Sequence, residues 1–291
     1  MQPVLDHVVL AVADLVAGAA AFERLLGRTP SWRGAHPALG TRNVLFRLDD
    51  VYVELLAVAP GGGALADLVA GALGERAERP LALALGVPDV VRAVADVRAR
   101  GITVTDPSPG RGTDDASGRV RTWRSAFVDP ATTRGLRLLL IEHTSAPGAL
   151  PAAPVSGDPA AACAGVDHVV VFTEDLEASI ALWRDGFGLA VSWQRDFAER
   201  ATRNAGLDLG GVTLELITRT DRPPSGRGDV LWGVAYRVAD CARAVERLRS
   251  AGIEADGPRP GLTPATSVST VRWPRTASLL IEGTLGGGLP C

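Results

Sequence analysis

The sequence predicts an α+β protein in which one βαβββ module is used four times, in two pairs. Residues 5–56 align without a gap to residues 166–217 at a constant offset of 161, with 18 identities in 52 positions. The second part of each copy repeats more loosely, as residues 81–142 and 231–282. Each unit opens with an apolar run typical of a strand and continues with helical spacing of apolar residues. The chain is therefore a tandem duplication.

Each module begins with a predicted strand, followed by an aspartate and a predicted helix. The four opening strands read HVVLAV, LALALGV, HVVVFT and GVAYRV. Their aspartates are suited to cap the helix N-termini, and they are Asp14, Asp89, Asp175 and Asp240. Gly101 and Gly252 predict the ends of the second and fourth helices. Further β runs complete the modules and end in VYVELLAV, LRLLLIE, VTLELI and SLLIE.

The repeat divides the chain into two expected domains. We predict a first domain over residues 1–144, with modules at 5–57 and 80–144, and a second over residues 165–287, with modules at 166–218 and 230–284. Residues 145–164 are rich in Pro, Ala, Gly and Ser and lack apolar periodicity, which is typical of a linker. Two similar halves predict a monomer that mimics a dimer, or a homodimer.

The composition excludes several classes of function. The 33 acidic and 30 basic residues give a net charge of −3, which does not favour nucleic acid or an anionic membrane as a partner. Three widely spaced cysteines fit neither a disulfide framework nor a thiolate zinc site. No signal peptide and no apolar run of about 18 residues is found. We therefore expect a soluble, cytoplasmic protein.

Strand alternation places a histidine and a glutamate on one face of each copy. In residues 6–12, His7 points away from the aliphatic set of Val8 and Leu10, so it should face the concave side of the sheet. Glu54 is expected to share that side. His168 and Glu215 repeat the pair with the same separation of 47 residues (54 − 7 and 215 − 168). Burying an unpaired carboxylate is unfavourable by several kcal/mol, which favours pairing or metal binding.

Two more glutamates end the last strands of the second and fourth modules, at Glu142 and Glu282. One imidazole with two carboxylates is a credible partial shell for a divalent ion. Two alternatives need no metal. The histidines would belong to a hydrogen-bond network, or the glutamates would pair with Arg42 and Arg203 in the neighbouring strand.

The module order, the opening LDHVVLAV and the closing VELL and LLIE resemble the vicinal oxygen chelate superfamily. That superfamily includes glyoxalase I, extradiol dioxygenases, methylmalonyl-CoA epimerase, and bleomycin- and fosfomycin-resistance proteins. The stretches HPALGTRNVLFRLDDVYVELLAV and PLALALGVPDVVRAVADVRARGI look most like its glyoxalase-like domain branch. The resemblance implies two domains, each with a curved mixed sheet around a cavity. It also implies two sets of metal ligands, which are His7, Glu54 and Glu142, and His168, Glu215 and Glu282.

The chain departs from this family at one ligand position. Metal-binding members often place a histidine at the start of the second module, where this chain has Ala82, and Gly233 in the second copy. His143 adjoins Glu142 and is therefore expected to point to the opposite face, and His36 lies in a predicted loop. An iron site with two histidines and one carboxylate is therefore disfavoured.

The predicted function is that of a divalent-metal-dependent lyase, isomerase or dioxygenase acting on a small molecule, with Zn, Mn, Ni or Fe as the ion. The metal would polarise a carbonyl and a glutamate would act as general base. The alternative is a non-catalytic protein that binds an antibiotic-type compound. We expect the first cavity to be the catalytic one, because Tyr52 and His36 replace Thr213 and Phe197 of the second copy. The predicted catalytic residues are Glu54, Glu142, Tyr52 and His36.

Overall fold

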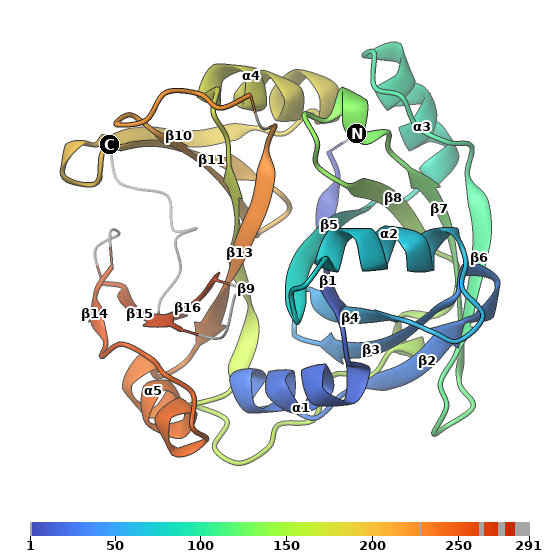
Figure 1. Ribbon diagram of the computed structural model, residues 1–291, viewed down its shortest axis with the longest axis horizontal. Coiled ribbons are helices and arrows are strands. Elements are labelled where there is room, and N and C mark those ends of the chain that lie inside the picture. Colours follow the sequence, from blue (N-terminus) through green and yellow to red (C-terminus); the bar gives the residue numbers. More distant parts are fainter. Residues whose placement is uncertain (1, 227, 262–264, 273–276, 283–291) are drawn as a thin grey trace.

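The protein contains two eight-stranded mixed sheets, one for each copy of the repeat (Figure 1). The computed structural model describes residues 2–226, 228–261, 265–272 and 277–282. The strand orders are β2-β3-β4-β1-β5-β8-β7-β6 and β10-β11-β12-β9-β13-β16-β15-β14. These orders correspond strand for strand, so the first module pairs with the second and the third with the fourth. The predicted α+β fold of four βαβββ modules is confirmed.

The first sheet and its helices form the first half of the protein. Its elements are β1 (Val4–Val12), α1 (Leu15–Leu26), β2 (Trp32–His36), β3 (Thr41–Arg47), β4 (Tyr52–Val58), α2 (Ala64–Leu73), β5 (Glu78–Gly86), α3 (Val90–Ala99), β6 (Ser108–Thr113), β7 (Val120–Phe127) and β8 (Leu138–His143). In both halves the two modules join through an antiparallel pair, β1 with β5 and β9 with β13.

The second half repeats this order without a counterpart of α2 in the part that the structure describes. Its elements are β9 (Cys163–Phe172), α4 (Leu176–Ala181), β10 (Val191–Phe197), β11 (Thr202–Asp208), β12 (Thr213–Arg219), β13 (Val230–Val238), α5 (Cys241–Ser250), β14 (Arg259–Pro260), β15 (Ser267–Val271) and β16 (Ala277–Glu282). A π-helical turn at Leu182–Gly186 continues α4. None of the helices in the described ranges has the length and apolarity needed to cross a membrane.

The predicted helix boundaries are confirmed at both ends. Asp14 accepts hydrogen bonds from the amides of Val16 (2.8 Å) and Ala17 (3.0 Å) at the start of α1. The other three aspartates cap α3, α4 and α5 in the same way. Gly101 and Gly252 follow α3 and α5 with φ of 85° and 76°, the left-handed conformation that glycine adopts without strain.

Helix α2 was not expected from the sequence and fills the hollow of the first sheet (Figure 1). Its buried residues Val69 and Leu73 pack on Val9 and Leu56, which lie on the face of the sheet that carries His7. In the second half, residues 220–226 and 228–229 connect β12 to β13 without a helix. The hollow of the first sheet is therefore occupied by the chain itself.

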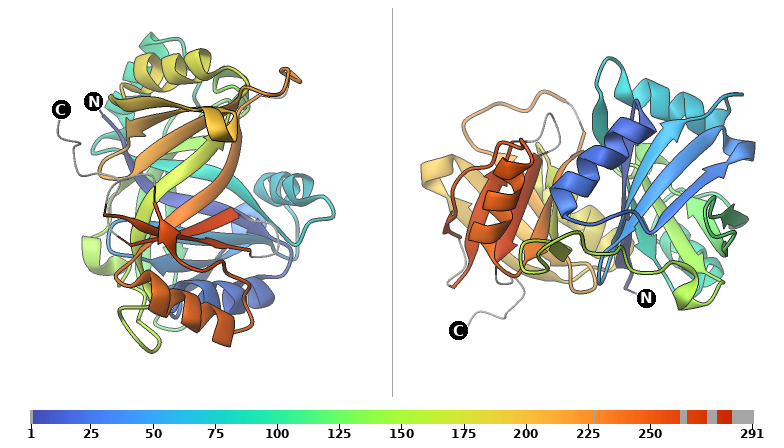
Figure 2. Two further views of the ribbon diagram at one scale, coloured as in Figure 1. Left: turned by 90° about the vertical axis from the view of Figure 1, so that its left-hand side faces the viewer. Right: turned by 90° about the horizontal axis from the view of Figure 1, so that it is seen from below.

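At the interface between the halves, α5 lies toward the end of α1 and α3 lies toward the end of α4 (Figures 1 and 2). Arg247 of α5 donates a hydrogen bond to the carbonyl of Leu25 in α1 (2.8 Å). Arg100, after α3, reaches the carbonyl of Gly186 beyond α4 (3.5 Å). One continuous apolar core contains buried residues from both sheets and from α1, α3, α4 and α5. The halves therefore pack on each other as a dimer of single domains would.

A buried arginine connects the two halves through the segment between them. Arg28 is 8% exposed and donates to the carbonyl oxygens of Cys163 (2.5 Å) and Ala153 (2.8 Å). Ala153 is itself buried, and its amide donates to the carbonyl of Arg47. The segment that we propose as the linker, 145–164, is thus packed against the first half.

We expect Arg28→Met to lower the free energy of unfolding by about 2 to 4 kcal/mol, because two buried carbonyls lose their charged donor. Urea unfolding followed by fluorescence measures this change. Because the halves share one core, the transition should remain single. Arg92→Met, at an exposed position on α3, is the control and should change the stability by less than about 0.5 kcal/mol. Equal effects of the two changes would contradict the role given to Arg28.

Candidate functional site

A polar triad of His7, Asn43 and Glu54 lies on the concave face of the first sheet. These residues come from the adjacent strands β1, β3 and β4, and the neighbours Val8 and Leu10 face the helices in the core. The Nε2 atom of His7 lies 3.4 Å from Oε2 of Glu54, and the Asn43 amide donates to Oε1 of Glu54 (2.8 Å). Strand alternation therefore placed this histidine and glutamate correctly.

The second sheet carries the same triad as His168, Asn204 and Glu215. Nε2 of His168 lies 3.6 Å from Oε2 of Glu215, and the Asn204 amide donates to Oε1 of Glu215 (2.8 Å). The Nδ1 atom of His168 lies 2.8 Å from a carboxylate oxygen of Asp167. His168 Nε2 is buried without a hydrogen-bond partner. The two triads have nearly equal geometry.

The structure decides between the two metal-free alternatives. Arg42 pairs with Asp115 (2.9 Å), and Arg203 pairs with Glu177 (3.0 Å) and Asp196 (3.2 Å). The hypothesis that these arginines pair with the strand glutamates is therefore wrong. The hydrogen-bond network around the histidines is the arrangement that the structure contains.

The prediction that Glu142 and Glu282 lie beside the histidines and glutamates of the triads is wrong. Oε2 of Glu142 accepts a hydrogen bond from the amide of Val90, the first residue of α3 (3.0 Å). Oε2 of Glu282 accepts one from the amide of Cys241, the first residue of α5 (2.9 Å). Both glutamates share the face of the core residues Leu140 and Leu280 on their strands, so they point to the helices. There they satisfy free amides at helix N-termini.

His143 occupies the face on which Glu142 was expected. Its Nε2 atom lies 2.9 Å from Asp6, and Asp6 also bonds Nδ1 of His7 at 2.6 Å. Burial by itself would lower the pKa of His7, but the hydrogen bonds to Asp6 and Glu54 outweigh it and raise this pKa. Burial would raise the pKa of Glu54, but His7 and Asn43 lower it to about 2. The first-half triad is therefore a tightly paired network of charges.

The first-half site is filled by its own side chains. Tyr52 stacks on His7 with ring centroids 4.2 Å apart, and Arg121 lies over the Tyr52 ring at 5.1 Å. Burial raises the pKa of the Tyr52 phenol well above its usual value. Leu150 completes a buried cluster with Trp32, Leu45 and Tyr52. Tyr52 thus fills space beside the triad.

His36 lies at the end of β2, away from direct contact with the triad. Its Nδ1 atom is 3.2 Å from the hydroxyl of Thr41, and its ring packs edge-on against Trp123 with centroids 6.1 Å apart. The structure therefore does not bring His36, Tyr52, Glu54 and Glu142 together as one set.

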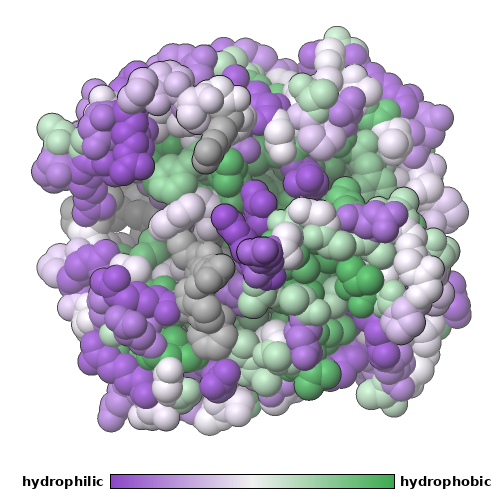
Figure 3. Space-filling model, in the orientation of Figure 1, coloured by the Kyte–Doolittle hydropathy of each residue, from purple (hydrophilic) through white to green (hydrophobic). Residues whose placement is uncertain are grey.

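The second-half triad borders an open cavity whose empty space, with the open solvent at its mouth included, is about 1090 Å³. Many hydrophilic residues lie on the second-half side of the face in Figure 3. His168, Asn204 and Glu215 belong to its lining, and so do the aromatic rings of Trp193 and Trp232. A cavity with apolar walls and a few polar groups is the usual form of a ligand site.

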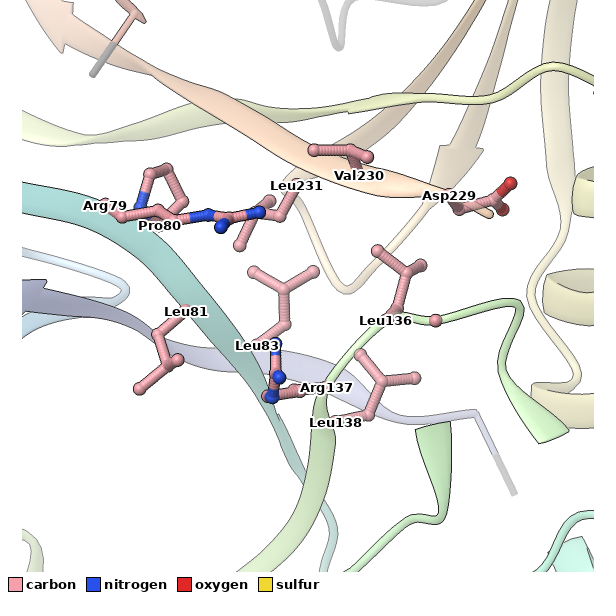
Figure 4. Close-up of a pocket in the computed structure, with 11 residues that line it drawn as sticks. Arg79, Pro80, Leu81, Leu83, Leu136, Arg137, Leu138, Asp229, Val230 and Leu231 are labelled. Carbon is pink, nitrogen blue, oxygen red and sulfur yellow. The ribbon is translucent and has the colours of Figure 1, made fainter. Parts of the chain in front are cut away.

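Another hollow lies between the halves, where β5 meets β13 (Figure 4). Leu83 and Leu138 of the first half face Leu231 of the second across it. The buried carboxylate at its end, Asp229, already accepts hydrogen bonds from Arg134 (3.1 Å) and Ser179 (2.6 Å). This space of about 420 Å³ belongs to the interface, and its acidic group is satisfied.

The residues present do not fit the predicted metal sites. Each triad offers one imidazole nitrogen and one carboxylate, and the third predicted ligand of each set points to a helix. Within the described ranges, no three His, Cys, Asp or Glu side chains group closely enough to hold a metal ion. A structural or catalytic metal needs at least three protein ligands in the usual sites.

Comparisons with solved structures identify the fold. A triple mutant of 4-hydroxymandelate synthase from Streptomyces coelicolor shares 20% identity over 99% of this chain and 95% of that protein, with a TM-score of 0.70. An Mn(II)-bound glyoxalase from Novosphingobium aromaticivorans shares 18% identity over 99% and 87%, with a TM-score of 0.63. A hypothetical protein from Staphylococcus aureus shares 12% identity over 97% and 99%, with a TM-score of 0.61. No curated protein matches the sequence.

Family models match both halves. Residues 5–159 match the glyoxalase-like domain, and residues 165–271 match the glyoxalase/bleomycin resistance protein/dioxygenase superfamily. The expected resemblance is thereby confirmed over most of the chain. The chain belongs to the glyoxalase-like family of the vicinal oxygen chelate superfamily and carries two of its domains in tandem.

Proposed function

We propose that this protein binds a small organic molecule in the cavity of its second half. The observation that carries this proposal is the open cavity beside His168, Asn204 and Glu215, with Trp193 and Trp232 in its walls. Buried polar groups at one end of an apolar space fix the orientation of a ligand, and aromatic walls supply contact area.

The first half supports this choice by comparison. It retains the triad of His7, Asn43 and Glu54, but Tyr52 and α2 occupy its hollow. The same triad thus exists with and without an adjoining cavity, so the triad alone does not mark the ligand site. We therefore assign ligand binding to the second half, in place of the first-half site expected from Tyr52 and His36.

Proton transfer at Glu215 is a second candidate function. Asn204 holds one carboxylate oxygen of Glu215, while the other lies 3.6 Å from the unpartnered Nε2 of His168. A carboxylate held in this way beside a cavity is suited to take a proton from a bound carbon acid. An isomerase or lyase activity would follow, in which Glu215 takes the proton from carbon and returns it to the product or to the leaving group.

A neutral fluorescent dye tests binding at the cavity. We expect N-phenyl-1-naphthylamine to bind wild-type protein with an increase in its emission. Leu279→Trp places a large ring in the cavity lining and should weaken binding at least tenfold. Leu139→Trp makes the same change at the corresponding position of the first sheet and should leave binding intact. Equal effects of the two substitutions, or no dye binding at all, would reject the proposed site.

The placement of Glu142 and Glu282 generates a prediction about metal and stability. Glu142→Gln and Glu282→Gln should leave the uptake of Zn or Mn unchanged in calorimetric titration, because neither carboxylate faces a triad. Each should lower the free energy of unfolding by about 0.5 to 1 kcal/mol, because a charged acceptor at a helix N-terminus is lost. If either variant loses tight metal binding that the wild-type protein has, the metal-ligand sets expected from the family would be supported.

Glu215→Gln separates catalysis from binding alone. If the site transfers protons, a bound carbon acid should exchange its C–H for deuterium in D₂O, as measured by NMR. Glu215→Gln should abolish this exchange, because the amide is not a base at neutral pH. Glu54→Gln is the matched control, since Glu54 has the same amide and imidazole neighbours. Exchange that survives in Glu215→Gln would exclude this role.

A further inference from the structure

We infer that the ligand of the second-half cavity is a flat aromatic molecule that carries a carboxylate. This inference rests on the proposed function and specifies the class of ligand. Three arginines line the cavity, and they are Arg195, Arg200 and Arg259. A guanidinium presents paired N–H donors in the geometry that a carboxylate accepts.

The curvature of the sheet brings these cations together. Arg195 lies on β10, and Arg200 follows β10 in the short 3₁₀ helix at Ala198–Arg200. Arg259 lies on β14. Strands β10 and β14 are the two edges of the second sheet, so only a strongly curled sheet places them around one cavity (Figure 1).

The charge of the cavity lining is unbalanced. Glu215 is its only carboxylate among the described residues, against three arginines, and Asn204 already binds one of the Glu215 oxygens. Arg200 lies 3.9 Å from the carboxylate of Glu199. Within the described ranges, Arg195 and Arg259 form no ion pair, whereas Arg203 on the neighbouring strand contacts two carboxylates. A cavity with excess positive charge favours an anionic ligand.

Aromatic rings stand beside the same cations. The Arg195 guanidinium lies 5.9 Å from the ring centre of Trp193, and that of Arg200 lies 5.9 Å from Phe197. Trp232, in the cavity wall, is 41% exposed and packs edge-on against Phe172. Rings that border cations suit a ligand with an aromatic body and an acidic end.

The internal repeat shows that these residues are specific to the second half. Subtracting the offset of 161 gives Gly34, His36 and Leu39 in the places of Arg195, Phe197 and Arg200. The residues that both halves share, such as Trp32 and Trp193, belong to the common fold. Arg195 and Arg200 thus have no arginine counterpart in the first copy, where Arg121 stacks on Tyr52, and this difference connects them to the cavity of the second half.

Four probes with one carbon skeleton test this inference by calorimetry. They are 2-naphthoate, 2-naphthamide, 2-naphthylmethylammonium and the saturated acid decahydro-2-naphthoate. We expect 2-naphthoate to bind at least tenfold more tightly than each of the others, and its affinity to fall as salt concentration rises. The ammonium probe should bind most weakly.

Substitution of the cavity arginines tests whether their charge makes the protein prefer the carboxylate probe. The double variant Arg195→Gln with Arg259→Gln should reduce the ratio of naphthoate to naphthamide affinity to about one, while naphthamide still binds. Arg203→Gln removes one charge outside the cavity and should preserve the ratio. Leu279→Trp should weaken both probes, which locates them in the cavity.

The outcomes separate this inference from the proposed function. If naphthamide or the ammonium probe binds as tightly as naphthoate, the inference of an anionic ligand is rejected. If Leu279→Trp still weakens that binding, the cavity remains the binding site. Equal binding of the saturated acid would overturn the aromatic requirement. Binding of the neutral dye without any of the four probes would also overturn the inference. Failure of the dye and of all four probes would overturn the proposed function as well.

Discussion

Side chains on the strands of this protein alternate between two environments, the apolar layer under the helices and the hollow of the sheet. The side of the sheet on which a polar side chain lies determines whether it contacts a helix N-terminus or the hollow of the sheet. His7 faces the hollow because Val8 and Leu10 face the helices. Glu142 faces the helices because it is in phase with Leu140, and there it meets the first amide of α3. A shift of one residue would exchange these roles.

The duplicated chain retains in one polypeptide the contacts that two subunits would otherwise form. Arg247 of α5 bonds to the end of α1 and so joins the fourth module to the first, and Arg100, after α3, joins the second module to Gly186 of the third. Because the apolar core continues between the sheets, neither half can open without exposing part of the other. The segment before β9 adds to this continuity through Arg28 and Ala153.

The fold could be predicted from the sequence because its signals are local and occur four times. Asp14 and Gly101, for example, mark a helix start and a helix end from residues within one turn. Glu142 resembles the family ligands in sequence, but its phase relative to the core residues Leu138 and Leu140 turns it toward the helices, so its predicted position is wrong. Helix α2 was missed because its counterpart segment is not helical, so the repeat gave no support for it.

The choice of cavity could not be predicted in the same way. Tyr52 indicated a reactive phenol when only its sequence neighbours were considered. Its actual role depends on Leu150 and Arg121, which reach it from distant parts of the chain. The arginines that distinguish the second half were visible as differences between the copies. Their convergence on one space depends on the curl of the sheet, which no local pattern records.

The filling of one hollow by α2 has a consequence for the way in which this chain responds to its ligand. A symmetric dimer of such domains has two equal sites, and coupling between them produces sigmoidal or biphasic saturation. Here the covalent link joins an open domain to a closed one. On the proposed assignment, occupancy then follows a simple hyperbola, and cooperative behaviour requires association between separate chains. On the same assignment, the first domain contributes support to the second and no ligand site of its own.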